Sequence, residues 1–212
     1  MLVLGHAGIT LGSAVLLSGA ITAIRSQKAT RENKTTASSH SPQPPAAPDN
    51  PRNRPALWLT SLARHIDIRL LLIGSLLTDI IDKPLGLIFS EVLSNTRTIS
   101  HTLLFTAIIS FAGLIIYRRS QKNWLLVVSL GAMVHLILDQ MWQTPETLFW
   151  PLFGFAFVNR DISSYVSDIF ESLTTKPEVY IPEIFGGLIL IWFAWEVLRR
   201  RKLISFIRYG RL

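Results

Sequence analysis

The chain has 212 residues, of which 49% are hydrophobic and 17% are charged, and its mean hydropathy is +0.37. Soluble domains carry about 25% charged residues, so this composition argues against a soluble protein. The lack of cysteine excludes disulfides and thiolate metal sites. The net charge of +7 would suit nucleic acid, but the basic residues stand in blocks beside apolar runs. That placement is typical of membrane topology control and excludes nucleic acid as the expected partner.

Five apolar stretches predict transmembrane helices, because about 20 apolar residues cross the hydrocarbon core of a bilayer. In chain order they cover residues 2–24, 66–82, 100–117, 124–141 and 181–198. Pro84 is expected to break or kink whatever follows the second stretch. We therefore predict an all-α fold, a polytopic integral membrane protein of about five transmembrane helices, placed as a multi-pass protein in the cell membrane.

The remaining segments differ from these stretches in composition. The first helix makes up residues 1–24, and residues 25–55 are rich in Ser, Thr, Asn, Pro and charge, which predicts a disordered cytoplasmic linker. Residues 56–198 form the predicted membrane domain with helices 2–5. Within it, residues 142–180 form a long extracytoplasmic segment with Trp and Tyr suited to an interfacial belt. Residues 199–212 are a basic cytoplasmic tail.

The Lys and Arg residues predict the orientation of the chain. Of the 21, 17 fall in residues 25–69, 118–122 and 199–212. The positive-inside rule places these three segments in the cytoplasm. Five crossings with the N-terminus outside and the C-terminus inside satisfy the rule, whereas an even number would strand one basic block on the wrong side.

Ionisable residues inside the predicted spans are costly there and mark a candidate functional site. They are His6, Asp79, Asp82, His101, His135, Asp139 and Glu183. The topology puts all seven near the extracytoplasmic ends of their helices. The i,i+4 and i,i+3 spacings put the His–Asp pair of helix 4 and the Asp pair of helix 2 each on one helical face. Imidazole and carboxylate groups are ligands for zinc, iron or manganese, so the sequence predicts a metal or acid–base site at this depth.

Simpler roles stay open for several of these residues. His6 would be solvated at the interface, and Asp79 or Asp82 would cap a helix or pair with Lys83, itself expected to be a solvated loop charge. The His–Asp pair of helix 4 would be a neutral contact between helices. For Glu183, placed in the first turn of helix 5, interaction with the helix dipole is the better interpretation.

Arg97 and the dipeptide Ser100-His101 form one further motif at the start of helix 3. An arginine beside a metal site would clamp a phosphate or carboxylate in bidentate fashion, whereas the alternative is a surface charge near acidic lipid headgroups. Ser100 is suited to be the N-cap of the helix. Adjacent helical positions face different directions, which disfavours a serine hydrolase that uses His101 as its base.

At these residues the sequence resembles the YdjM-like, LexA-regulated family of membrane-bound metal-dependent hydrolases. The matching motifs run in order from residue 6 to 151 and comprise His6 with Gly8 and Gly12, Asp79 and Asp82, Arg97 with Ser100 and His101, His135 with Asp139, and Trp150-Pro151. The sequence departs from the family at Thr78, where Pro is frequent, at Thr96, where His is frequent, and in the wider spacing of the two Asp residues. The resemblance implies a hydrolase without naming its substrate.

Our leading hypothesis is a metal-dependent hydrolase acting at the outer leaflet or on an extracytoplasmic substrate. The expected metal ligands are His6, Asp79, His101, His135 and Asp139, with Asp82 as general base and Arg97 as the group that binds an anion. Either Asp79 or Asp82 would serve as the helix 2 ligand.

The expected cofactor is a divalent metal ion, zinc first, with manganese or iron as alternatives. The expected partners are the lipid bilayer and a lipid or phosphoester substrate, since the site opens at headgroup depth. Two other functions remain open. One is a transporter or ion-conducting protein that uses the same His and Asp residues, and the other is a structural membrane protein whose polar residues hold helices together.

Overall fold

The computed structural model describes residues 2–17, 19, 67–89, 95–155, 157, 165–201 and 203–209. Every regular element in these ranges is a helix, which confirms the all-α prediction. Residues 1–12 and 67–212 belong to one compact unit, and of the second unit, residues 13–66, only 13–17 and 19 are described. The predicted linker at 25–55 lies outside the described residues.

Helix α3 (Ile68–Ile88) begins at Asp67, whose side chain accepts the Arg69 N–H at 2.9 Å. The predicted end of this helix at residue 82 is wrong, because Pro84 lies inside it and the helix continues for another turn. A proline removes one backbone hydrogen bond from a helix. Buried contacts on both sides of Pro84, at Asp82 and Gly86, keep the helix continuous here.

Helix α5 (Leu103–Ser120) follows a 3₁₀ turn, η2 (Ile99–His101), so the predicted helix start at residue 100 is wrong. The N-cap is Thr102 rather than Ser100, since the Thr102 hydroxyl accepts the Phe105 N–H at 3.0 Å. The helix ends at Gln121, which adopts a left-handed conformation with φ of 55°. Because His101 lies in this 3₁₀ turn and not in α5, its side chain is able to point toward α3.

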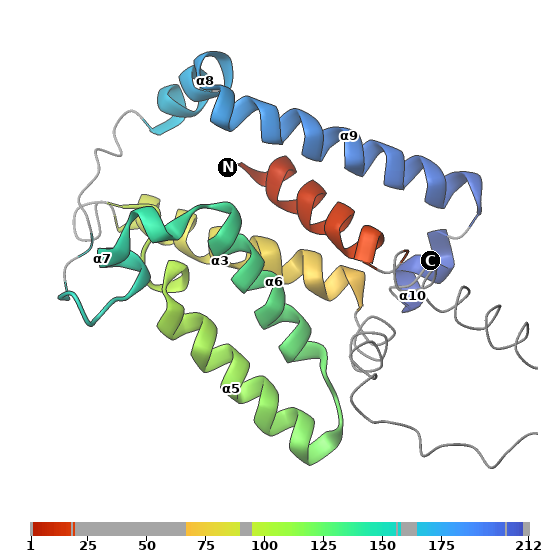
Figure 1. The fold of residues 1–212 in the computed structure, drawn as a ribbon, viewed down its shortest axis with the longest axis horizontal. Coiled ribbons are helices and arrows are strands. Elements are labelled where there is room, and N and C mark those ends of the chain that lie inside the picture. The colour runs from red at the N-terminus through yellow and green to blue at the C-terminus, as the bar shows by residue number, and fades with distance from the viewer. Residues whose placement is uncertain are drawn as a thin grey trace, which may run out of the picture. The chain divides into compact units, whose positions relative to one another are not determined.

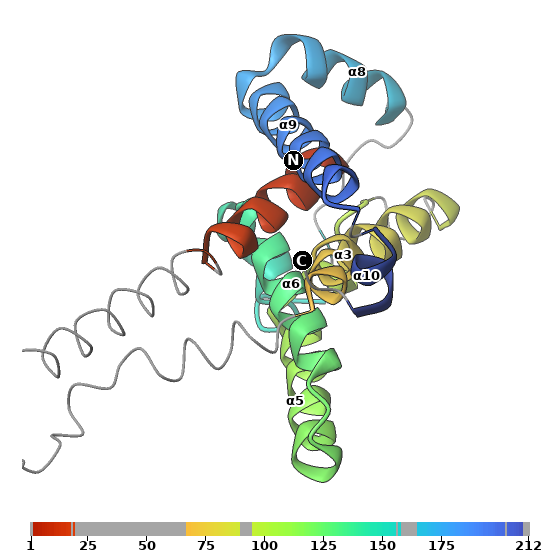
Figure 2. The same ribbon diagram turned by 90° about the vertical axis from the view of Figure 1, so that its right-hand side faces the viewer.

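Helix α6 (Trp124–Leu138) forms a hairpin with α5 and crosses α3 closely (Figures 1 and 2). The crossing depends on two glycines. A Cβ at Gly74 of α3 would lie 2.1 Å from the Val128 carbonyl oxygen, and one at Gly131 of α6 would lie 2.4 Å from that of Leu71. Small residues allow backbones to approach in this way in membrane helices. The crossing brings Asp79 of α3 next to the C-terminal end of α6.

The segment predicted as extracytoplasmic contains the short elements η3 (Met141–Gln143) and α7 (Pro145–Leu148) and the amphipathic helix α8 (Tyr165–Thr175). Helix α9 (Pro177–Arg199) then begins four residues earlier than predicted and packs against α8 and against α10 (Leu203–Tyr209). Both Pro177 and Pro182 fall within α9, the first of them at a position that suits proline.

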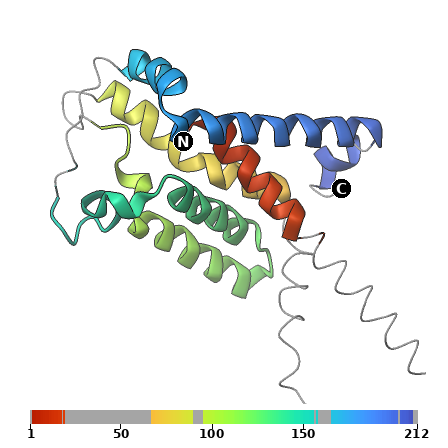
Figure 3. The same ribbon diagram turned by 45° about the horizontal axis from the view of Figure 1, so that its top comes forward.

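The N-terminal helix (Val3–Leu17) crosses α9, and the two backbones come into close contact at Gly8 and Gly186 (Figure 3). A Cβ at Gly8 would lie 2.1 Å from the carbonyl oxygen of Gly186, so neither position tolerates a side chain. Glu183 of α9 accepts the N–H groups of Leu2 and Leu4 at 2.6 and 3.0 Å. The prediction that Glu183 serves the dipole of its own helix is wrong: it stands beyond the first turn of α9 and caps another helix.

Among the described residues two helices, Leu103–Ser120 and Pro177–Arg199, are long and apolar enough to cross a membrane. Only 11% and 22% of their apolar windows are buried, so their side chains are available to lipid. The helices Val3–Leu17 and Trp124–Leu138 are apolar but shorter. The number of crossings and the orientation of the chain stay predictions.

Candidate metal centre

Five of the predicted site residues meet in one buried cluster. His6 comes from the N-terminal helix, Asp79 from α3, His101 from η2, His135 from α6 and Asp139 from the C-cap of α6. The three histidines are 0% exposed. Two overlapping triads, His6–Asp79–His135 and His101–His135–Asp139, each place one ligand atom per residue within 4.8 Å of the others. These groups are positioned to hold a metal ion.

The ring hydrogens of two histidines can be assigned from their partners. His135 Nδ1 lies 2.6 Å from the Ser75 carbonyl oxygen, and His101 Nδ1 lies 2.8 Å from Asp82 Oδ2. Both partners only accept, so each Nδ1 donates a hydrogen and each neutral ring keeps a lone pair on Nε2. The two Nε2 atoms lie 3.3 Å apart. Two lone pairs this close repel each other, and a cation between them relieves the repulsion.

Both carboxylates turn an oxygen toward this pair of nitrogens. Asp79 Oδ1 lies 3.6 Å from His101 Nε2 and 3.8 Å from His135 Nε2, and Asp139 Oδ2 lies 3.9 and 3.8 Å from the same atoms. Ligand atoms about 2.0–2.2 Å from a tetrahedral ion are separated by roughly 3.3–3.6 Å. Three of the four observed separations are slightly wider than those of a closed tetrahedral site, so a small inward movement of the carboxylates would complete coordination.

His6 joins the cluster next to His135 and Asp139. Its ring centroid lies 4.0 Å from that of His135, and its Nε2 lies 3.2 Å from Asp139 Oδ1. His6 Nε2 is thus paired with Asp139, whereas His6 Nδ1, which is also buried, forms no hydrogen bond within the described residues. A buried ring nitrogen without a hydrogen-bond partner is costly. Coordination of this nitrogen to a metal ion would satisfy it.

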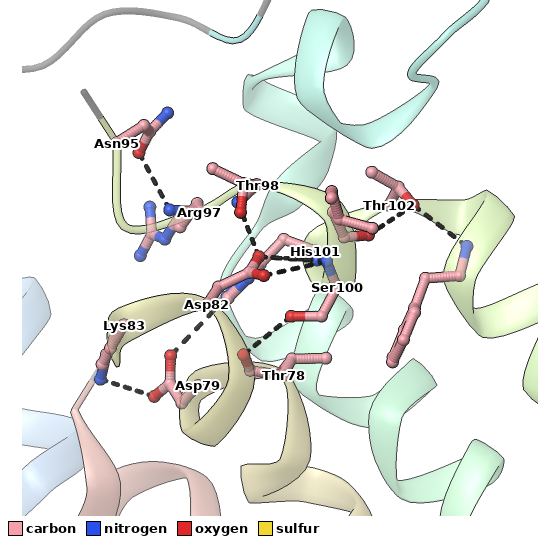
Figure 4. A network of polar contacts seen from close by, with 12 residues as sticks. Thr78, Asp79, Asp82, Lys83, Asn95, Arg97, Thr98, Ser100, His101 and Thr102 are labelled. Carbon is pink, nitrogen blue, oxygen red and sulfur yellow. Dashed lines mark hydrogen bonds and ion pairs between the residues drawn. The ribbon is translucent and has the colours of Figure 1, made fainter. Parts of the chain in front are cut away.

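Asp82 has a different position from Asp79, although both side chains reach His101 (Figure 4). Its carboxylate accepts the backbone N–H groups of Thr98, Ser100 and His101 at 2.6 to 3.2 Å, in addition to the His101 ring. Four donors therefore occupy its two oxygens. These contacts favour a role in which Asp82 fixes the turn and the ring of His101, rather than the predicted role of a general base.

Ser100 also fastens this turn to α3, since its hydroxyl donates to the Thr78 carbonyl oxygen at 2.8 Å (Figure 4). The serine and the histidine of the Arg-x-x-Ser-His motif therefore have roles in the local structure. The serine and the histidine hold η2 against α3, and the ring of His101 faces the cluster as a result.

Lys83 and Arg97 border the cluster on its accessible side. Lys83 Nζ lies 2.6 Å from Asp79 Oδ2, and an Arg97 guanidinium nitrogen lies 2.8 Å from Asp139 Oδ2. Their side chains are 25% and 28% exposed, whereas the carboxylates they contact are nearly buried. The prediction that Lys83 is a solvated loop charge is wrong, because α3 extends past it. Arg97 lies at the site as predicted.

One contributor was missed by the sequence analysis. The backbone carbonyl of Ser75, which receives the His135 hydrogen, gives no signal in a sequence because any residue carries one. The pairing of Asp79 with Lys83, one of the alternatives that the sequence left open, is confirmed. Their i,i+4 spacing puts both side chains on one face of a continuous helix.

Comparison with known proteins gives one result. The family model of the YdjM inner membrane protein matches residues 45–203, three quarters of the chain. The match includes every cluster residue except His6, which precedes it. No curated protein and no solved structure matches the chain significantly.

Proposed function

Because the chain belongs to the YdjM inner membrane protein family, we propose that it is a membrane-bound metal-dependent hydrolase whose His/Asp cluster binds a divalent ion. The observation that carries the proposal is the 3.3 Å approach of the His101 and His135 Nε2 atoms, each with its Nδ1 hydrogen committed elsewhere. Metal-binding histidines usually donate their second ring N–H to a carboxylate or a backbone carbonyl. Asp82 and Ser75 provide one partner of each kind.

The proposed ligands are His101, His135, Asp79 and Asp139, with His6 as a fifth donor. The donor set of imidazoles and carboxylates suits zinc first and leaves manganese and iron as alternatives. When bound, such an ion supplies a Lewis acid and activates water for attack at neutral pH. His135 offers only one free nitrogen, so the two overlapping triads share a single ion.

Residues around the cluster would hold the metal ligands in position. Lys83 and Arg97 each hold one oxygen of a ligand carboxylate, which aims the carboxylate at the histidines. Asp82 holds His101 in the tautomer that presents Nε2 to the ion. The carboxylate oxygens that do not face the pair of Nε2 atoms are Asp79 Oδ2 and Asp139 Oδ1, which are paired with Lys83 and His6. One of them would accept the proton of the water in exchange for that contact.

Charge favours an anionic substrate. The carboxylates of Asp79, Asp82 and Asp139 exceed the cations of Lys83 and Arg97 by one charge, so a bound divalent ion leaves the site with one excess positive charge. A phosphodiester carries a single negative charge and would neutralise the site. Its oxygens would contact Arg97 and Lys83 at the accessible border of the cluster, because guanidinium and ammonium groups bind phosphate well. We therefore propose a phosphoester, of the kind present in lipid headgroups, as substrate.

We further propose five crossings with the N-terminus outside and the C-terminus inside. The distribution of Lys and Arg supports this arrangement, and α5 and α9 meet the length and composition of membrane helices. The shorter apolar helices Val3–Leu17 and Trp124–Leu138 would complete the bundle together with α3. In this topology the cluster opens on the extracytoplasmic side.

Metal content of the purified protein tests the proposal most directly. The full chain is purified in detergent and bound metals are measured by inductively coupled plasma mass spectrometry, in parallel with the double variant His135→Ala, Asp139→Ala. The expected result is about one metal ion per chain in the native protein and none in the double variant. Glu146→Gln, at an exposed acid of α7, is the control and should retain the metal. Equal metal content in the native protein and the double variant would refute the metal site.

Activity is then tested with bis(p-nitrophenyl) phosphate and with phospholipid vesicles. Hydrolysis should disappear with a chelator and return with zinc or manganese. Metal uptake into proteoliposomes without hydrolysis would instead identify a transporter. Normal cellular function in Arg97→Ala and Asp139→Ala variants, with only their stability lowered, would identify a structural protein.

A further inference from the structure

An apolar loop, residues 149–155, follows α7 and exposes three large apolar side chains. Leu152, Phe153 and Phe155 are 84%, 67% and 81% exposed. Scattered exposed apolar residues are ordinary on protein surfaces, but three in one short loop form a contiguous patch. Such a patch marks a surface that contacts a membrane or another protein.

The loop has a defined conformation that turns these side chains outward. The Trp150 indole N–H donates to the Phe155 carbonyl oxygen at 3.2 Å, and the Leu152 and Gly154 N–H groups donate to Phe149 and Pro151 carbonyl oxygens at 2.8 and 3.1 Å. The Trp150 ring stacks on Phe157 with centroids 5.6 Å apart. Gly154 has a φ of 125°, a conformation that a residue with a side chain rarely adopts.

The loop is attached to the metal centre through α7. Helix α7 packs against η2, the turn that carries His101. At its end, Leu148 is buried together with Leu136 and Met141, which flank Asp139 in the chain. The loop therefore starts from a segment held on two sides by elements of the cluster, and its depth in a membrane would set the depth of the cluster.

We infer that residues 149–155 insert Leu152, Phe153 and Phe155 into the bilayer leaflet nearest the His/Asp cluster. The occupant of this apolar surface is lipid, because the chain belongs to a family of inner membrane proteins. Tryptophan prefers the headgroup boundary, with its ring in contact with hydrocarbon and its N–H near polar groups. Trp150, partly buried at the base of the loop, is placed accordingly, and the loop anchors the cluster at headgroup level.

Spin labels attached to single cysteines test this inference, and the natural absence of cysteine makes every label specific. Cysteine replaces Leu152, Phe153 or Phe155 in the full chain, reconstituted into vesicles of phosphatidylethanolamine and phosphatidylglycerol. Gln143→Cys and Glu146→Cys are controls, because both are exposed polar positions in the adjoining η3 and α7. Power saturation compares the collision of each label with oxygen, which concentrates in hydrocarbon, and with a water-soluble nickel chelate.

The expected result is an inverted ratio, with oxygen collisions dominant at the three loop positions and nickel collisions dominant at the two controls. Nickel collisions that dominate at the loop as well would overturn the inference, since the loop would then lie in water. Labels shielded from both reagents would also overturn it, because a protein partner or a second copy would then cover the loop. Depth is measured without turnover, so a failure of the proposed hydrolysis leaves this result unaffected.

Discussion

His101 and His135 face each other across 3.3 Å with their Nε2 atoms, while the hydrogens of both rings point away, to Asp82 and to Ser75. Neutral rings in this arrangement have no hydrogen to share. Metal binding would therefore stabilise the native fold, which contains the pair, more than the unfolded chain. A ligand present at a hundredfold excess over its dissociation constant stabilises by about 2.7 kcal/mol.

We accordingly predict that a chelator lowers the unfolding temperature of the purified protein by several degrees and that added zinc restores it. Differential scanning fluorimetry in detergent gives the measurement. His101→Ala should unfold at the same temperature with and without chelator. A chelator effect that persists in that variant would place the metal elsewhere in the chain.

Asp82→Asn should weaken metal binding without removing the site. An asparagine has one accepting oxygen in place of two, so it cannot serve the backbone N–H groups and the His101 ring together. Loss of a carboxylate that orients a ligand histidine typically lowers metal affinity by 10–100-fold. Competition with a fluorescent zinc chelator measures the affinity, and saturating zinc should still give full occupancy. Asp79→Asn, which changes a proposed ligand, should not reach full zinc occupancy even at saturating zinc.

Arg97→Ala should impair catalysis more than metal binding. The guanidinium lies at the accessible border of the cluster, and its loss removes a positive group that would hold the substrate's anion. Removing one such electrostatic contact costs about 10²–10³ in rate at well-organised sites. Steady-state kinetics on bis(p-nitrophenyl) phosphate, with metal content measured in the same preparation, separate the two effects. Unchanged kcat/KM would remove Arg97 from the proposed substrate site.

Two adjacent glycines of α9 provide a matched pair of alanine variants that tests how the helix crossing contributes to stability. A Cβ at Gly186 would lie 2.1 Å from the Leu4 carbonyl oxygen, whereas one at Gly187 would have only the end of the Leu4 side chain at 3.8 Å. We expect Gly186→Ala to destabilise the protein by about 1–3 kcal/mol through overpacking. Gly187→Ala should leave stability unchanged or slightly raised. Equal unfolding temperatures for the two variants would contradict the observed helix crossing.

The topology can be tested with a membrane-impermeant maleimide on intact cells. Glu146→Cys, in the segment proposed to lie outside, should be labelled without lysis. Gln121→Cys, between α5 and α6, should be labelled only after the cells are opened. Both positions are exposed, so accessibility within the protein does not differ between them. Labelling of Gln121→Cys in intact cells would reverse the proposed orientation.

Much of this arrangement was predictable because it depends on spacing along single helices. The i,i+4 separation of His135 and Asp139 puts both side chains on one face of the α6 end, where their facing atoms lie 3.8 Å apart. The all-helical fold followed from the long apolar runs. Helix boundaries near prolines were less predictable. Pro84 and Pro182 lie inside α3 and α9 against the local preference of proline, whereas Pro177 begins α9 in agreement with it.

The contacts between distant segments were not predictable from local patterns. Asp79 and Asp82 share a helical face, yet one turns to the histidine nitrogens and the other to the backbone of the 98–101 turn. That difference depends on how the turn folds against α3. Glu183 caps the N-terminal helix by accepting the N–H groups of Leu2 and Leu4, which are 181 and 179 residues away in the sequence. No local pattern encodes a contact over such a separation.

The crossing of the N-terminal helix with α9 has a consequence for biosynthesis. His6 leaves the ribosome well before the surface that seats its helix, which lies at Glu183 and Gly186 of α9. Domains assemble as their parts emerge, from the N-terminus onward. The helix that carries His6 therefore has to wait in the membrane for α9, and a chain interrupted before α9 would lack the surface that seats one of its imidazole donors.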